Sequence, residues 1–174
     1  MSQIDQEKLE ELQESLSKLQ NSRKTLLLST VTSEGFPEIS YAPYVRNESG
    51  QFFIFISELA SHTQNIMNTA KASVMFINEE SESRNLFARE RLIYQCSSIE
   101  VDNESDLYHT QLDAMEAEFG NMISMLRTLK DFHLFCLEPE RGSYVVGFGK
   151  AYDVDPVSGT LIHIDEEKLK QGKG

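Results

Sequence analysis

The sequence lacks any stretch near the roughly 18 consecutive apolar residues that a membrane-spanning helix needs. Its first residues, MSQIDQEKLEELQ, are acidic and polar, whereas a signal peptide is basic and then apolar. We therefore expect a cytoplasmic protein that has no membrane partner.

Cysteine is scarce as well. The chain has two, Cys96 and Cys136, and neither has a partner at C-x-x-C spacing. Each lies in an apolar, strand-like run. We expect two buried thiols, and neither a disulfide framework nor a zinc site.

Basic side chains are few for a chain of this size: 16 Lys and Arg stand against 28 Asp and Glu, giving a formal net charge of −12. This charge repels the phosphate backbone that supplies most nucleic-acid affinity, so no nucleic-acid partner is expected. A negatively charged ligand, such as a flavin phosphate or a haem propionate, needs a local cluster of cations in such a chain.

The 174 residues contain 40% hydrophobic side chains, no repeat and no linker, which indicates a single domain over 1–174. Within residues 1–21, Leu9, Leu12, Leu16 and Leu19 recur at steps of three and four and predict an amphipathic N-terminal helix. The polar C-terminal tail, 155–174, is expected to be mobile unless a ligand or a partner subunit orders it.

Strand-like segments joined by short turns make up most of the chain. They lie at 25–32, 38–45, 52–57, 72–78 and 91–101, followed by two strands within 131–154 that turn near Pro139 and Gly142. This succession predicts a mostly β protein with helices, of the α+β class, built on an antiparallel six-stranded barrel.

Helical segments interrupt the strands at three places. Residues 57–70 predict a short helix with Ser61 as its N-cap and Gln64 completing a capping box. Residues 81–90 predict a helical turn. The apolar spacing over 105–129 predicts a longer helix that Gly120 breaks in two.

Four phrases, in order, resemble one known family. They are RKTLLLSTV at 23–31, GFPEISYAPY at 35–44, SELASHTQN at 57–65, and LFARERL at 86–92 followed by DFHLFCLEPERGSYVVGFGKAY. Together they resemble the HugZ/HutZ haem-utilisation proteins over most of the chain. The resemblance implies a split β-barrel that forms a homodimer along its strands, with ligand sites at the subunit interfaces. It also implies haem binding for iron acquisition and, as in several members, an oxidoreductase reaction that opens the porphyrin ring.

The same fold resembles that of the pyridoxamine 5'-phosphate oxidase-like proteins that bind flavin mononucleotide (FMN), and fold alone does not separate these functions. FMN-binding relatives place Lys or Arg on the loop after the third strand. Here that loop reads LASHT at 59–63, and the strong cation is missing. Ser61, Thr63 and the amides at the helix start remain candidate phosphate ligands. An FMN-dependent oxidoreductase is therefore one alternative, and a non-catalytic haem storage or delivery protein is another.

Haem needs an axial donor, and histidine is its commonest protein ligand. The chain has four histidines. We expect His109 to be a solvated residue of a helix and His133 to be a packed or half-exposed residue of the barrel. His62 and His163 remain as candidates.

The resemblance implies an axial histidine from the C-terminal tail of the partner subunit. The only histidine of this tail is His163, whereas relatives carry theirs at the position of Lys168. Three possibilities stay open: His163 takes the role, another donor such as Lys168 replaces it, or tight haem binding is lost. Lys168 ranks below His163, because an amine ligates iron only when neutral and its pKa is about 10.4.

The remaining site candidates also follow from the resemblance. His62 and Asp131 match a polar pair near the haem at the dimer interface, and Arg91 matches an arginine near the open face of the haem. Arg89 is a second candidate cation for a propionate. Alternatively, Asp131 caps the chain before a strand, His163 is an ordinary strand residue, and Arg84, Arg89 and Arg91 form a solvated face paired with Glu82 and Glu90.

Overall fold

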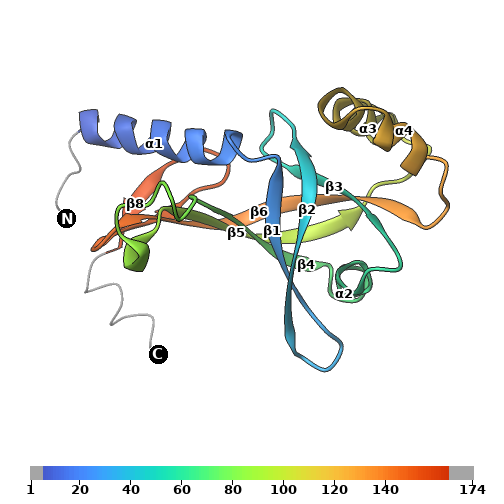
Figure 1. Ribbon diagram of the computed structural model, residues 1–174, viewed down its shortest axis with the longest axis horizontal. Helices are drawn as coiled ribbons and strands as arrows, with labels where there is room; N and C mark the ends of the chain where they lie inside the picture. Colours follow the sequence, from blue (N-terminus) through green and yellow to red (C-terminus); the bar gives the residue numbers. More distant parts are fainter. Residues whose placement is uncertain (1–5, 165–174) are drawn as a thin grey trace. The chain divides into compact units, whose positions relative to one another are not determined.

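The computed structural model describes residues 6–164. Its elements, coloured along the chain in Figure 1, are α1 (Gln6–Asn21), β1 (Thr25–Val31), β2 (Pro37–Arg46), β3 (Phe52–Ser57), α2 (Ser61–Thr69), β4 (Lys71–Ile77), η1 (Leu86–Ala88), β5 (Arg91–Glu100), α3 (Asp106–Phe119), α4 (Asn121–Leu126), β6 (Phe132–Gly147), β7 (Lys150–Val154) and β8 (Leu161–His163). The described residues divide into two compact units. The first unit comprises 6–23, 75–94 and 140–164, and the second comprises 24–74 and 95–139.

Six antiparallel strands form the barrel. Their order is β3-β2-β1-β4-β5-β6, and β3 pairs with β6 as well, which closes the sheet. In the register of β3 on β6, Phe52 lies opposite Leu137 and Ser57 lies opposite Phe132. The predicted α+β class and six-stranded split barrel are confirmed.

The predicted turn at Pro139 and Gly142 is wrong, because β6 runs unbroken from Phe132 to Gly147. A Cβ atom on Gly142 would lie 2.8 Å from the ring of Tyr94 and 2.8 Å from Cβ of Val154. Gly142 therefore serves the close packing of β5 and β7 on β6, and the chain reverses later, around Gly149, which has a φ of 65°.

Helices α3 and α4 pack on the strands of the second unit, and Gly120 separates them with a φ of 77°, as the sequence predicts. The cluster that joins them to β3 and β6 includes Phe53, Leu112, Met115 and Leu134. Complete burial of such a side chain contributes about 1.5–3 kcal/mol. Cys136 belongs to this cluster and Cys96 is also buried, which confirms both as buried thiols.

Two boundaries differ from the sequence predictions. Helix α2 begins at Ser61, but its N-cap is Ala60 and no side chain caps it, so Ser61 as N-cap is wrong. The helical turn within 81–90 is the short 3-10 helix η1, capped by the Asn85 side chain. In the described part of the C-terminal tail, β8 pairs with β7 and Leu161 is buried.

Candidate functional site

A cavity of about 250 Å³ opens in the first unit, between the segment 78–90 and the hairpin that joins β6 to β7. We call it the arginine pocket. The polar and aromatic residues that line it include Asn78, Arg84, Asn85, Arg89, Glu90 and Phe148. Of the two predicted cations, Arg89 lines this pocket, and Arg91 lies two residues farther along the chain.

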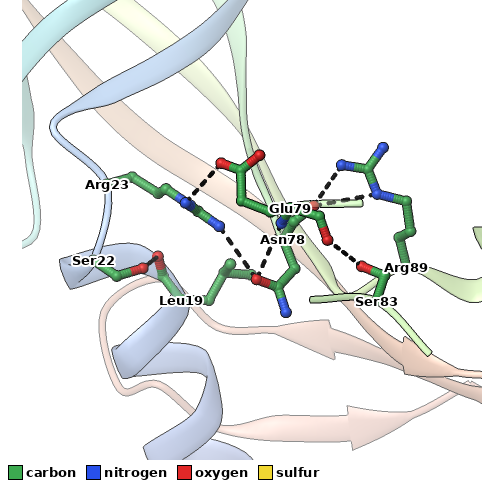
Figure 2. A network of polar contacts seen from close by, with 7 residues as sticks. All are labelled: Leu19, Ser22, Arg23, Asn78, Glu79, Ser83 and Arg89. Carbon is green, nitrogen blue, oxygen red and sulfur yellow. Dashed lines mark hydrogen bonds and ion pairs between the residues drawn. The ribbon is translucent and has the colours of Figure 1, made fainter. Parts of the chain in front are cut away.

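Arg89 is held in place by the end of β4. Its Nε and Nη2 atoms both donate to the carbonyl oxygen of Asn78, at 3.2 and 2.5 Å (Figure 2). Its Nη1 atom lies 3.4 Å from Glu80. Because two donors of one guanidinium share a backbone acceptor, the orientation of the side chain is constrained. Arg89 is thus a preorganised cation at the pocket wall.

Asn78 links this cation to a second arginine. The Oδ1 atom of Asn78 accepts from Nη2 of Arg23 at 3.2 Å, and Nη1 of Arg23 pairs with Glu79 at 2.9 Å. The Ser83 hydroxyl donates to the Glu79 carbonyl at 2.6 Å, as Figure 2 shows. These bonds tie the loop after β4 to the connection between α1 and β1.

Arg91 lies at the start of β5, and its Nη1 atom donates to the Arg89 carbonyl at 3.1 Å. The structure therefore brings Arg89 and Arg91 together. The predicted pairing of the arginines with Glu82 and Glu90 is wrong, because the ion pair of Arg89 is to Glu80.

Glu90 instead accepts hydrogen bonds from two hydroxyls, those of Tyr144 on β6 and Ser15 on α1, the latter at 2.8 Å. Tyr144 is completely buried. Burial, and next the bond to Glu90, hold the pKa of Tyr144 well above its usual range. No local pattern in the sequence indicates this contact, since Ser15 and Tyr144 lie far from Glu90 along the chain.

His163 also belongs to the first unit, on β8. Its Nε2 atom donates to the Gly149 carbonyl at 2.9 Å, and its ring packs against Tyr152 with centroids 5.2 Å apart. The neighbour of Gly149, Phe148, lines the arginine pocket. His163 is therefore joined to the pocket through one hairpin, and its expected position on a final strand is confirmed. Lys168 lies outside the described residues.

Ser61, His62 and Thr63 belong to the second unit and form the first turn of α2, directly after the loop that follows β3. Thr63 is completely buried, and its hydroxyl donates to the Ser57 carbonyl at 2.6 Å. Burial lowers the pKa of His62, and the charge of Glu38 opposes this shift. This segment thus holds an imidazole whose neutral form is favoured by burial and a nearby carboxylate, and residues 57–63 contain no Lys or Arg.

Asp131 anchors the end of β3. Its carboxylate accepts from the Ser57 hydroxyl at 2.6 Å, and its carbonyl accepts from the Glu58 amide at 2.8 Å. Within residues 6–164, no hydrogen bond joins His62 to Asp131. The two residues flank the same loop, but Ser57 is the partner of the carboxylate.

Sequence reasoning missed the role of His133, on β6. Its Nδ1 atom lies 2.6 Å from Glu100 and its Nε2 atom 2.6 Å from Glu58. Burial lowers the pKa of His133, but the hydrogen bonds to the two carboxylates outweigh this effect and raise the pKa. His133 is a barrel residue, as expected, and His109 is exposed on α3, also as expected.

Over residues 6–164, no group of three His, Cys, Asp or Glu side chains is arranged to hold a metal ion. Among the described helices, none has the length and apolar composition to span a membrane.

Comparison with known proteins matches residues 10–146 to the family described as pyridoxamine 5'-phosphate oxidase. A curated relative named heme oxygenase HutZ, from Vibrio cholerae serotype O1, is 39% identical over 176 residues, which cover 99% of this chain and 98% of the relative.

Two solved structures have the same fold. One is HutZ of Vibrio cholerae, described there as the heme storage protein, with a TM-score of 0.73 and 36% identity over 78% of this chain and 96% of that one. The other is ChuZ of Campylobacter jejuni, with a TM-score of 0.77 and 30% identity over 89% of this chain and 63% of that one. The chain therefore belongs to the HugZ/HutZ family of proteins with the pyridoxamine 5'-phosphate oxidase fold.

Proposed function

We propose that this chain is a haem-utilisation protein of the cytoplasm that binds haem as a homodimer and degrades it oxidatively, releasing iron. The observation that carries this proposal is the 39% identity to a protein named heme oxygenase over nearly the whole length of both chains. The position of Arg89 at the pocket wall, with Arg91 hydrogen-bonded to its carbonyl and both on the same unit as His163, supports it.

FMN is the ligand that the wider fold suggests, and the residues of the β3–α2 loop do not fit its phosphate. The Thr63 hydroxyl is already engaged with the Ser57 carbonyl, and the Glu38 charge acts on His62 in the same region. A phosphate dianion placed there would meet a carboxylate and no arginine or lysine of the loop.

Four of the candidate residues are assigned to the proposed site. His163 supplies the axial nitrogen, for which its Nε2 atom must leave the Gly149 carbonyl or its Nδ1 atom must bind. One nitrogen of Arg91 donates to the Arg89 carbonyl, and its remaining N–H groups are the proposed hydrogen-bond donors at the open face of the haem. His62 and Asp131 belong to the β3 end, where Asp131 holds the loop through Ser57. Bound haem is both the substrate and the source of redox chemistry.

Storage without ring opening is the second candidate, favoured by the description of the Vibrio cholerae structure as a heme storage protein. Arg91 distinguishes the two functions. Storage requires binding alone, whereas degradation requires a donor placed to stabilise charge that develops during the reaction. Removal of Arg91 should then impair turnover more than binding.

The test begins with an absorption titration of the purified protein with hemin, after a spectrum of the protein as isolated. We expect a saturable Soret band that His163→Ala removes, and a decay of that band when ascorbate is added. Arg91→Ala should slow the decay by about tenfold to a hundredfold while it changes the hemin affinity less. A stable Soret band in ascorbate would establish storage in place of degradation. If the isolated protein shows flavin absorbance and hemin induces no Soret band, both haem degradation and haem storage are contradicted and a flavin function is supported.

A homodimer is part of this proposal, and the outer face of the β1–β2 hairpin supports it. Ile39 and Tyr41 are 74% and 65% exposed, and they alternate with residues that face the barrel interior. Their partners on β1 are Ser29 and Leu27. Contiguous apolar surface of this kind commonly marks an interface, and here a second copy of this chain is the occupant.

A further inference from the structure

The arginine pocket has donors that the fold itself does not use. Within residues 6–164, the Arg84 guanidinium has no hydrogen-bond or ion-pair partner. The Asn85 side-chain oxygen accepts from the Phe87 amide at 3.0 Å, which leaves its amide hydrogens available. Both residues line the cavity. The pocket therefore offers a free cation and a free amide beside Arg89, the cation that Asn78 holds in place.

The two carboxylates at the pocket do not neutralise this cluster equally. The Oε1 atom of Glu90 accepts hydrogen bonds from the hydroxyls of Tyr144 and Ser15. Glu82 is exposed, so water screens its charge. In a chain with a net charge of −12, an arginine without an acidic partner is a specific place for an anion.

The volume of the pocket and its aromatic wall limit the class of ligand that fits. Pockets that enclose a whole drug-sized molecule measure about 300–1,000 Å³, whereas this one measures about 250 Å³. It accommodates an acidic arm of a larger molecule. Phe148, which is 69% exposed, forms part of the wall and offers an aromatic surface to the body of that molecule.

We propose that the arginine pocket is the subsite for the propionate carboxylates of a porphyrin, with Arg84 and Asn85 as donors and Phe148 against the edge of the ring. This inference rests on the proposed haem function and adds to it a site for the carboxylates.

Two porphyrins separate the carboxylate contact from the rest of the site. Hemin carries two free propionates, and hemin dimethyl ester keeps the iron and the ring but lacks both charges. Soret titrations give Kd values for both with the wild-type protein, with Arg84→Gln and with Arg141→Gln. Arg141 is a matched control, because it is an exposed arginine of the same unit that does not line the pocket.

We expect Arg84→Gln to raise the Kd for hemin by about tenfold, the loss of one charge-assisted contact, and to leave the Kd for the dimethyl ester within about twofold. Arg141→Gln should change neither. Equal weakening of both porphyrins by Arg84→Gln, or no weakening of hemin, would overturn the subsite and leave the haem function standing. If hemin gives no saturable band with the wild-type protein, the proposed function itself fails.

Discussion

His163 and Gly149 are joined by a hydrogen bond of 2.9 Å from the ring Nε2 atom to the carbonyl oxygen. A carbonyl only accepts, so Nε2 carries the proton and a neutral ring keeps its lone pair on Nδ1. Iron ligation through Nε2 and this hydrogen bond exclude each other. If His163 ligates iron as proposed, ligation through Nε2 would break this hydrogen bond to the β6–β7 hairpin, whereas ligation through Nδ1 would leave it intact.

The same bond predicts a cost for His163→Ala in the absence of haem. The change removes one hydrogen bond and the edge contact with Tyr152, so the free energy of unfolding should fall by about 1 kcal/mol. Urea denaturation of the haem-free protein measures this value. His109→Ala, at an exposed histidine of α3, is the control and should leave the unfolding midpoint unchanged. An equal effect of both variants would contradict the structural role of His163.

Gly142 is predicted to tolerate no side chain. In Gly142→Ala the new Cβ atom would lie 2.8 Å from both Tyr94 and Val154, which are buried and cannot move aside. We expect a loss of about 1–3 kcal/mol in the free energy of unfolding. Gly147→Ala is the matched control on the same strand, because the nearest atom to its Cβ lies at 3.7 Å. Thermal unfolding of the two variants should differ clearly, and similar Tm values would contradict the packing argument.

Much of the fold was predictable because its signals are local. The strand Phe52–Ser57 is apolar on both faces and follows a turn, and its predicted and observed bounds agree. Gly120 breaks the long helical segment where the apolar spacing is interrupted. The turn assigned to Gly142 failed because glycine also serves close packing, and the contact with Tyr94 on another strand leaves no mark in the local sequence.

The candidate site was less predictable, since its contacts join residues distant in sequence. Arg89 and Arg91 are neighbours in the sequence, but the carbonyl that accepts from the Arg89 side chain belongs to Asn78, at the end of a different strand. Likewise, Asp131 binds Ser57 across 74 positions of the chain, and a propensity argument does not reach such a pair.

His133 makes stability depend on pH. Its folded-state pKa is raised above the ordinary value of 6.5, so its contribution is fully present below that value and is lost as the pH rises through the raised pKa. The destabilisation caused by His133→Gln should therefore be larger at about pH 6 than at about pH 9. Urea denaturation at both pH values measures it.

Two controls support that measurement. His109→Gln, at an exposed histidine, should show no such difference between the two pH values. Glu58→Gln and Glu100→Gln each remove one carboxylate from His133, and each should reduce the pH dependence of the wild-type protein. A loss from His133→Gln that stays constant from pH 6 to 9 would show that packing, and not charge, is what the ring contributes.

The exposed face of the β1–β2 hairpin predicts the oligomeric state. Ile39→Glu places a charge on a side chain that is 74% exposed in one chain but buried if two copies meet at this face. Desolvation of an unpaired carboxylate costs several kcal/mol, enough to convert a dimer into monomers at micromolar concentration. Sedimentation velocity distinguishes the two states. Val157→Glu, at a side chain that is 90% exposed on the other unit, is the control and should remain dimeric. A dimer that survives Ile39→Glu would mean that the two copies meet through another surface.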